Sequence, residues 1–205
     1  LTEFIPISST AHLKVISVFL GVDDPGPSFS AIIQIGSVIA LVWYFRKDIF
    51  KFKNQSPKKH LEFLLNEKLF RSTLIGTIPI IFLGGTIKIF IPNFFDNILR
   101  SNLSIALVSF LMAIYMYIAD TSKKGSKNLR NHNNSDSFLI GLSQAFAIFP
   151  GVSRSGVTIS TALVSGWERD DAAKFSFILG MPAISLAAIV EFIFSLNNFS
   201  SFSFL

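Results

Sequence analysis

The chain of 205 residues contains no cysteine, which excludes disulfide bonds, thiolate metal sites and cysteine nucleophiles. Charged side chains are also scarce, at 15% of the residues, whereas 50% of the residues are hydrophobic and 23 are phenylalanine. A soluble domain of this length does not need so much apolar surface. The composition therefore predicts an integral membrane protein.

Apolar stretches close to the length that spans a bilayer recur along the chain. They occupy residues 28–45, 72–91, 102–119 and 174–196, with a further apolar segment at 138–166. Loops rich in Lys and Arg follow the first and third stretches, and the positive-inside rule places both loops in the cytoplasm. Membrane topology thus explains the net charge of +5, and we expect no nucleic acid partner. The predicted fold class is all-α, a polytopic transmembrane helical protein.

One arginine stands inside the apolar segment, in the sequence Pro-Gly-Val-Ser-Arg-Ser-Gly at residues 150–156. A charge in such surroundings is costly, which favours a functional role for Arg154, and its rigid fork of donors matches phosphate oxygens. Hydroxyls and glycines that suit an anion surround it: Gly151, Ser153, Ser155, Gly156 and Thr158. A helix that starts after Gly156 would point its positive end at the same anion. The simpler interpretation is a turn with a helix cap and an arginine that reaches the lipid headgroups.

The N-terminal residues repeat the pattern that leads to Arg154. Residues 1–9 and 142–155 each have Leu, a hydroxyl residue, Glu or Gln, an apolar run, a Pro and a Ser-rich tip. Residues 29–36 and 175–180 are also similar and follow their tips at nearly the same distance. This order predicts a duplicated unit, residues 1–45 and 138–196, in which a re-entrant hairpin precedes a spanning helix.

The mixed charges at residues 167–171 do not decide whether residues 138–166 cross the membrane or return as two half-helices. The repeat favours the return, because an inverted second unit would have a hairpin that enters from the cytoplasm, whereas the first hairpin enters from outside. Two such hairpins bring their tips together inside the protein, near the middle of the bilayer. The side chains expected to face one another there are Glu3, Ser8, Ser9 and His12 on one tip and Ser153, Arg154 and Ser155 on the other.

This set of side chains suits phosphoryl transfer, which depends on positioning and on neutralising charge. Ser9 and His12 are three residues apart, so on a helical turn they share a face. His12 would take the Ser9 proton, or itself attack or protonate a phosphorus–oxygen bond. Glu3 suits three roles: orienting His12, activating water, or binding a divalent cation that bridges two phosphates. The simpler interpretations are that Ser8, Ser9 and Thr10 cap a helix and that His12 is a buried histidine with satisfied hydrogen bonds.

The two tips resemble a known family. Residues 1–12, Leu-Thr-Glu-Phe-Ile-Pro-Ile-Ser-Ser-Thr-Ala-His, and residues 150–160, Pro-Gly-Val-Ser-Arg-Ser-Gly-Val-Thr-Ile-Ser, closely resemble both signature regions of the bacterial undecaprenyl-pyrophosphate phosphatases, the bacitracin-resistance proteins. The similarity runs through the chain, including residues 29–36, 141–144 and 175–182.

The resemblance implies a membrane hydrolase that removes the terminal phosphate of undecaprenyl pyrophosphate, so that the monophosphate carrier returns to peptidoglycan synthesis. It also implies dependence on a divalent cation, Mg²⁺ or Ca²⁺, and an inverted-repeat fold with two re-entrant regions. The implied location is the bacterial plasma membrane, with a site that opens to the periplasmic or extracellular side.

The resemblance also assigns roles to individual residues. Glu3 matches the second acidic residue of the family's Glu/Gln-x-x-x-Glu motif and a metal-binding role, and Arg154 matches its phosphate-binding arginine. Ser9 and His12 match the proposed nucleophile and acid/base. The implied substrate-binding set is Ser8, Gln144, Ser153, Arg154, Ser155, Gly156 and Thr158. The choice between Ser9 and His12 as nucleophile stays open, as does a homodimer.

Two features depart from the family pattern. The first acidic residue of the motif would precede Leu1 and the last spanning helices would follow Leu205, so we expect a fragment that lacks both ends. Ala11 stands where the family has Gly, which costs backbone freedom but keeps His12 in register.

The main alternative is a transporter of an anionic or lipid-phosphate substrate, since carriers also combine inverted repeats, broken helices and a midplane charge. A carrier, however, has no need of a hydroxyl and a histidine beside a carboxylate. A purely structural membrane protein would leave Arg154 unexplained. Hydrolysis of a lipid pyrophosphate separates the first interpretation from the other two.

Overall fold

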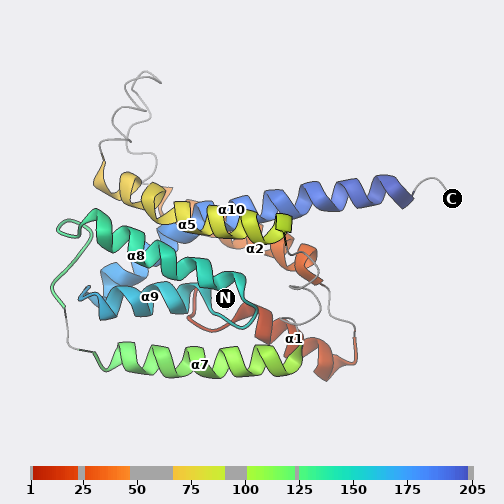
Figure 1. The fold of residues 1–205 in the computed structure, drawn as a ribbon, viewed down its shortest axis with the longest axis horizontal. Helices are drawn as coiled ribbons and strands as arrows, with labels where there is room; N and C mark the ends of the chain where they lie inside the picture. Colours follow the sequence, from red (N-terminus) through yellow and green to blue (C-terminus); the bar gives the residue numbers. More distant parts are fainter. Residues whose placement is uncertain (1, 23–25, 47–66, 91–100, 123–124, 203–205) are drawn as a thin grey trace, which may run out of the picture.

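A computed structural model describes residues 2–22, 26–46, 67–90, 101–122 and 125–202, shown in Figure 1. Every regular element in these ranges is a helix, apart from an isolated β-bridge between Lys127 and Trp167, so the predicted all-α class is confirmed. The helices are α1 Ser9–Leu20, α2 Gly26–Tyr44, α5 Lys68–Phe90, α7 Asn102–Asp120, α8 Asn134–Ala145, the 3-10 turn η2 Phe146–Ile148, α9 Arg154–Val164 and α10 Arg169–Phe202.

Three of the described helices contain segments long and apolar enough to cross a membrane: Lys68–Ile87, Asn102–Asp120 and Arg169–Val190. Large apolar side chains cover the outer surface of α7, where Leu103 is 80% and Phe110 64% exposed. Such a surface needs a bilayer around it rather than water. The prediction of a multi-pass membrane protein is confirmed.

The broken pair α8 and α9 lies in the middle of the bundle. α5 packs against α8, α10 against both α2 and α9, and α7 against α9 on the opposite side. In Figure 1, α2, α5 and α10 lie together, α7 runs along the far edge, and α8 and α9 run between them. The predicted break in the apolar segment is therefore shielded by other helices, as irregular backbone in a membrane requires.

Close contact between two glycines brings α5 and α8 together. A Cβ on Gly141 would overlap the Gly76 backbone, its carbonyl oxygen above all, so only hydrogen fits at this crossing. The Gly84-Gly85 pair of the same helix does not pack so closely. A Cβ on Gly85 would meet nothing within 4 Å, and one on Gly84 would meet only Ile148, at 3.7 Å.

The break between α8 and α9 contains the Pro-Gly pair that predicted it. Gly151 has φ of +99°, a left-handed conformation that favours glycine, and a Cβ there would lie 2.8 Å from the Ile105 carbonyl oxygen of α7. α9 then begins at Arg154, because the Ser153 Oγ accepts a hydrogen bond from the Gly156 amide at 3.2 Å and caps the helix. This start is earlier than the predicted one after Gly156, so Arg154 itself is the first helical residue.

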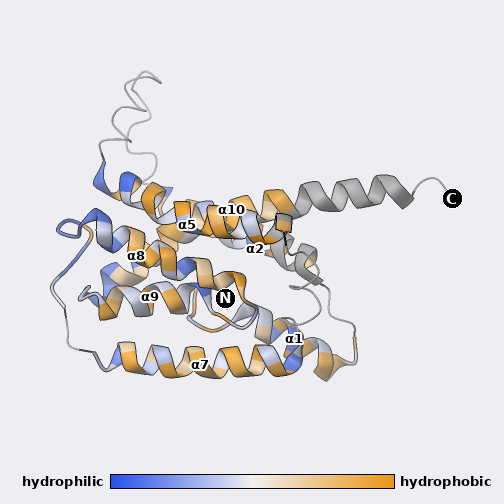
Figure 2. Ribbon diagram, in the orientation of Figure 1, coloured by the Kyte–Doolittle hydropathy of each residue, from blue (hydrophilic) through white to orange (hydrophobic). Residues whose placement is uncertain are grey.

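The polar ends of the helices gather at one end of the molecule. The C-terminal ends of α2 and α7 and the N-terminal ends of α5 and α8 lie on the left of Figure 1, where Figure 2 shows hydrophilic residues. Lys68 at the start of α5 donates a hydrogen bond to the Arg130 carbonyl at 2.8 Å. The described segments beside both basic loops are thus in contact, as expected for loops on one side of a membrane.

Candidate active site

The N-terminal tip consists of a turn over residues 2–7 and the start of α1. The Ser8 Oγ accepts a hydrogen bond from the Ala11 amide at 3.3 Å and caps this helix, as Ser153 caps α9. In Figure 1, α1 and α9 begin near the centre of the molecule and run in opposite directions. The two serine-capped helix starts therefore converge on one region.

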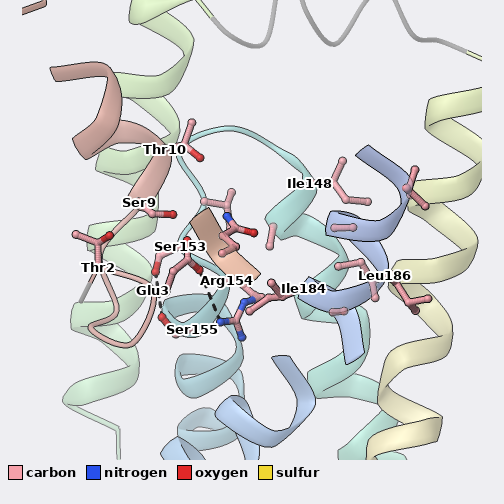
Figure 3. Close-up of a pocket in the computed structure, with 18 of the residues that line it drawn as sticks. Thr2, Glu3, Ser9, Thr10, Ile148, Ser153, Arg154, Ser155, Ile184 and Leu186 are labelled. Carbon is pink, nitrogen blue, oxygen red and sulfur yellow. Dashed lines mark hydrogen bonds and ion pairs between the residues drawn. The ribbon is translucent and has the colours of Figure 1, made fainter. Parts of the chain in front are cut away.

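Two contacts join the tips across 150 positions of sequence. The Glu3 carboxylate lies 3.9 Å from the Arg154 Nη2, and the two side chains are only 13% and 10% exposed. The Ser155 Oγ donates a hydrogen bond to the Ile5 carbonyl at 3.4 Å. Figure 3 shows Glu3, Ser153, Arg154 and Ser155 pointing toward one another. The predicted meeting of the tips is what the structure shows.

The guanidinium of Arg154 contacts α10. Its Nη1 donates a hydrogen bond to the Ser176 carbonyl at 3.5 Å, and its Cζ lies 2.6 Å from where a Cβ on Gly180 would be. The Arg154 Nη2 is enclosed and makes no hydrogen bond within the described residues, although it faces Glu3. A buried donor without a hydrogen bond is costly, so this nitrogen is available for an anionic ligand.

A cavity of about 920 Å³ opens beside this ion pair. One part of its lining is polar: Thr2, Glu3, Ser9, Thr10, Gln34, Ser153, Arg154 and Ser155. The other part comes from apolar side chains and glycines of α5, η2 and α10, including Ile80, Gly84, Ile148, Ile184 and Leu186. In Figure 3 the polar side chains lie on one side of the space and Ile148, Ile184 and Leu186 on the other. This arrangement suits a ligand with an anionic head and an apolar tail.

Comparison of the sequence with known proteins identifies the family of this chain. Residues 1–204 match the family described as Bacitracin resistance protein BacA. Undecaprenyl-diphosphatases of Prochlorococcus marinus strains MIT 9312 and MIT 9301 are 78% and 74% identical over 204 residues, which is 100% of this chain and 76% and 77% of those proteins. The undecaprenyl-diphosphatase of Trichodesmium erythraeum is 47% identical over 193 residues, which is 93% of this chain and 62% of that protein. This chain belongs to the BacA family.

Five of the residues that the sequence assigned to the BacA site line the cavity: Glu3, Ser9, Ser153, Arg154 and Ser155. The others lie around it. Ser8 is buried as the cap of α1. His12 is exposed and outside the cavity lining, and its Nδ1 lies 2.8 Å from the Ser8 carbonyl oxygen. Because a carbonyl only accepts, Nδ1 carries the proton and the lone pair of the neutral ring is on Nε2.

Three further residues of the assigned set lie behind the cavity wall. The Gly156 amide donates its hydrogen bond to the Ser153 Oγ, so Gly156 helps to cap α9 rather than to bind a ligand. Thr158 is fully buried, donates a hydrogen bond to the Arg154 carbonyl at 2.9 Å and lies 2.6 Å from the Ser176 Oγ. Gln144 is fully buried in α8, and its side-chain amide has no partner within the described residues.

The oxygen atoms at the polar end fit a hard cation that also binds substrate phosphates. Glu3 is the one carboxylate that lines the cavity among the described residues, and the Thr2, Ser9 and Thr10 hydroxyls lie on the same lining. Within the described ranges, no three or more His, Cys, Asp or Glu side chains are grouped so that they could hold a metal ion by themselves. Mg²⁺ commonly binds through one or two carboxylates plus phosphate oxygens, so this donor set suits a cation that arrives with a diphosphate.

Sequence reasoning missed three residues of the site. Gln34 lines the cavity, Ser176 holds both Arg154 and Thr158, and Gly180 makes room for the guanidinium. The signal for Gln34 was a polar amide side chain within a helix that the sequence predicts to span the membrane. The signal for Ser176 was the Phe-Ser pair shared by residues 29–30 and 175–176. Gly180 ends the repeated segment 175–180, but nothing in the sequence indicated that a guanidinium takes its side-chain space.

Proposed function

We propose that this chain hydrolyses undecaprenyl pyrophosphate to undecaprenyl phosphate and inorganic phosphate. The observation that carries the proposal is the meeting of Glu3 and Arg154, 3.9 Å apart, at the polar end of a largely apolar cavity. The guanidinium supplies charge to the diphosphate, and the apolar wall accepts the start of the isoprenoid chain. The high identity to undecaprenyl-diphosphatases supports this substrate.

The cavity favours Ser9 as the nucleophile. Of the two candidates, Ser9 lines the cavity whereas His12 does not. In this scheme the Ser9 Oγ attacks the terminal phosphorus, the anhydride bond breaks, and the lipid monophosphate leaves. The Nε2 of His12 takes the hydroxyl proton, and water then releases inorganic phosphate from the serine. Arg154 neutralises charge on the transferred group through its Nη2, which has no hydrogen bond to any of the described residues.

A divalent cation, Mg²⁺ or Ca²⁺, completes the proposed site. Glu3 would hold it together with the diphosphate oxygens, and when bound it would offset their negative charge. Such a cation fits this site because the donors at the polar end of the cavity are hard oxygen atoms. The loss of activity in a chelator, restored by one of these metals, is the expected behaviour.

We also propose that residues 1–45 and 138–196 are inverted repeats. Ser8 and Ser153 cap α1 and α9 in the same way, and each of these helices is followed by a long helix, α2 or α10. The opposite directions of α1 and α9 support the inversion. The proposed location is the bacterial plasma membrane, with the basic loops in the cytoplasm and the site open to the periplasmic or extracellular side. A homodimer stays a prediction.

The test is phosphate release from undecaprenyl pyrophosphate by the purified protein in detergent. Arg154→Lys keeps the charge but loses the planar fork, so activity should fall by about 100-fold or more. Ser109→Ala on α7, which loses only a 3.3 Å hydrogen bond to the Gly151 carbonyl, is the matched control and should keep most activity. No release by folded wild-type protein, with either metal, would overturn the proposed function.

A further inference from the structure

Among the side chains that the structure describes, α2 contributes one to the cavity lining, that of Gln34. Its neighbours Ile33 and Ile35 are 49% and 39% exposed and turn away from the protein, whereas Gln34 is half-buried. Leu41, two turns later on the same helix face, is buried. The packing of α2 against α10 therefore turns Gln34 inward, toward the cavity wall that holds Arg154.

The Gln34 side chain has no hydrogen-bond partner in the part of the chain that the structure describes. Its carboxamide has two N–H donors and one carbonyl acceptor. Because Gln34 is half-buried and lines the cavity, its donors and its acceptor can reach polar atoms of a ligand in that space, which a leucine could not do. A ligand in the cavity would therefore be the hydrogen-bond partner of the Gln34 amide.

The charges in the cavity decide which kind of partner this is. Arg154 is its one basic residue among the described residues, and part of the guanidinium is already used by the Ser176 carbonyl. A diphosphate has more acceptor oxygens than the remaining guanidinium donors can satisfy. A carboxamide adds two donors without a charge, which avoids the cost of a second buried cation.

We propose that Gln34 is a substrate-binding residue, which donates hydrogen bonds from its carboxamide nitrogen to the diphosphate head group. The inference rests on the proposed hydrolysis and adds a third segment, α2, to the two tips that form the site. In the proposed duplicated unit, the helix that follows the tip then also contributes to the site, through Gln34 of α2.

The experiment compares steady-state kinetics on undecaprenyl pyrophosphate for wild type, Gln34→Leu and Gln34→Glu. Gln34→Leu keeps the size but loses the donors, so KM should rise about 5- to 10-fold while kcat changes by less than about 3-fold. Inorganic pyrophosphate, used as a competitor, should inhibit this variant correspondingly more weakly. Ser37→Ala is the matched control, since Ser37 lies on α2 outside the cavity lining, and it should behave as wild type.

Gln34→Glu provides a readout that a structural role would not produce. At pH 8 the new carboxylate repels the diphosphate, and kcat/KM should fall about 50-fold or more. Lowering the pH protonates the carboxyl, which removes the charge and restores a donor. The ratio of variant to wild-type kcat/KM should therefore rise as the pH falls toward 5.

The outcomes separate this inference from the function on which it rests. Inactive wild-type protein would overturn the proposed hydrolysis itself. Active wild type together with an unchanged KM in Gln34→Leu would overturn the role of Gln34 alone, as would a pH-independent ratio for Gln34→Glu. If Gln34→Leu does not give a monodisperse protein, Gln34→Asn takes its place, because the shorter amide keeps its chemistry but loses reach.

Discussion

The Glu3 carboxylate and the Arg154 guanidinium form a loose ion pair, 3.9 Å apart, in which each partner comes from a different serine-capped tip. At this distance the two groups are close enough to attract each other but not to satisfy each other's hydrogen bonds. The cavity therefore contains a positive and a negative group that can each bind a ligand. An anionic head group can then bind Arg154 while Glu3 remains available for a cation or a water molecule.

This geometry predicts different kinetic roles for the two residues. In Glu3→Gln, kcat on undecaprenyl pyrophosphate should fall about 100-fold or more, because the carboxylate that we propose to act in the chemical step is lost. KM should stay within about 3-fold of wild type, since a neutral amide no longer repels phosphate. Steady-state phosphate release measures both constants. A raised KM with unchanged kcat would show instead that Glu3 acts only by holding Arg154.

The hydroxyl contact between Thr158 and Ser176 predicts a positioning role. The two Oγ atoms lie 2.6 Å apart with no exposed surface, and the Ser176 carbonyl accepts from Arg154. Thr158→Val has the same shape but leaves the Ser176 hydroxyl without its partner, so the protein should lose about 1–3 kcal/mol of stability. The kcat/KM value should fall about 10-fold as Arg154 loses its support.

Thr158→Ser is the matched control for this substitution, because it keeps the hydroxyl and removes only a methyl group. It should retain kcat/KM within about 3-fold of wild type, at a stability cost of about 1 kcal/mol. Thermal unfolding in detergent and phosphate release test the pair. Equal activity in the Val and Ser variants would contradict the positioning role of the hydroxyl.

The helices and the meeting of the two tips were predictable from the sequence. The helices at 28–45 and 102–119 follow from apolar length, and the break at residues 150–151 follows from the Pro-Gly pair. Arg154 was predictable because a charge is rare in an apolar segment. Such signals are local, so a single sequence carries them.

The supporting contacts were not predictable, because they depend on which helix faces come together. Gly180 differs from other helical glycines only in that Arg154 occupies its side-chain space, and Gly141 only in that Gly76 crosses it. His132 lies in a basic loop by sequence, yet it is 2% exposed. These contacts and this burial depend on the tertiary structure, and no periodicity or motif in the chain indicates them.

The contact between Gly76 and Gly141 predicts a large effect from a single methyl group. In Gly141→Ala the new Cβ would overlap the Gly76 backbone, so α5 and α8 must separate. Overpacking of this kind costs about 1–3 kcal/mol, which thermal unfolding in detergent would record as a lower Tm.

Gly36→Ala is the control for this prediction, because a Cβ at Gly36 in α2 would meet nothing within 4 Å. It should leave the Tm unchanged or raise it, since alanine is the better helix former by about 1 kcal/mol. Equal Tm values for Gly36→Ala and Gly141→Ala would contradict the glycine contact.

His132 is buried beside the polar end of the bundle. Its Nε2 lies 2.7 Å from the Ser72 Oγ and its Nδ1 3.2 Å from the Asn128 carbonyl oxygen, while the ring packs against Trp167 and Phe175. Burial lowers the pKa of His132 below 6.5, and the charge of nearby Lys68 acts in the same direction; the Asn128 and Leu129 backbone and the Asp136 carboxylate oppose the shift. The folded protein therefore favours the neutral ring.

The direction of this shift predicts a stability that falls in acid. Above pH 6.5 the ring is neutral in both states, so its contribution is complete; below that value the unfolded chain binds a proton more readily than the folded one. The loss should reach at most about 1.4 kcal/mol per pH unit until the folded ring also titrates. Thermal unfolding from pH 7.5 to 5 should show a shallower decline in His132→Gln than in wild type. His12→Gln removes an exposed histidine and should leave the slope unchanged, whereas a full decline in His132→Gln would assign the acid sensitivity to another group.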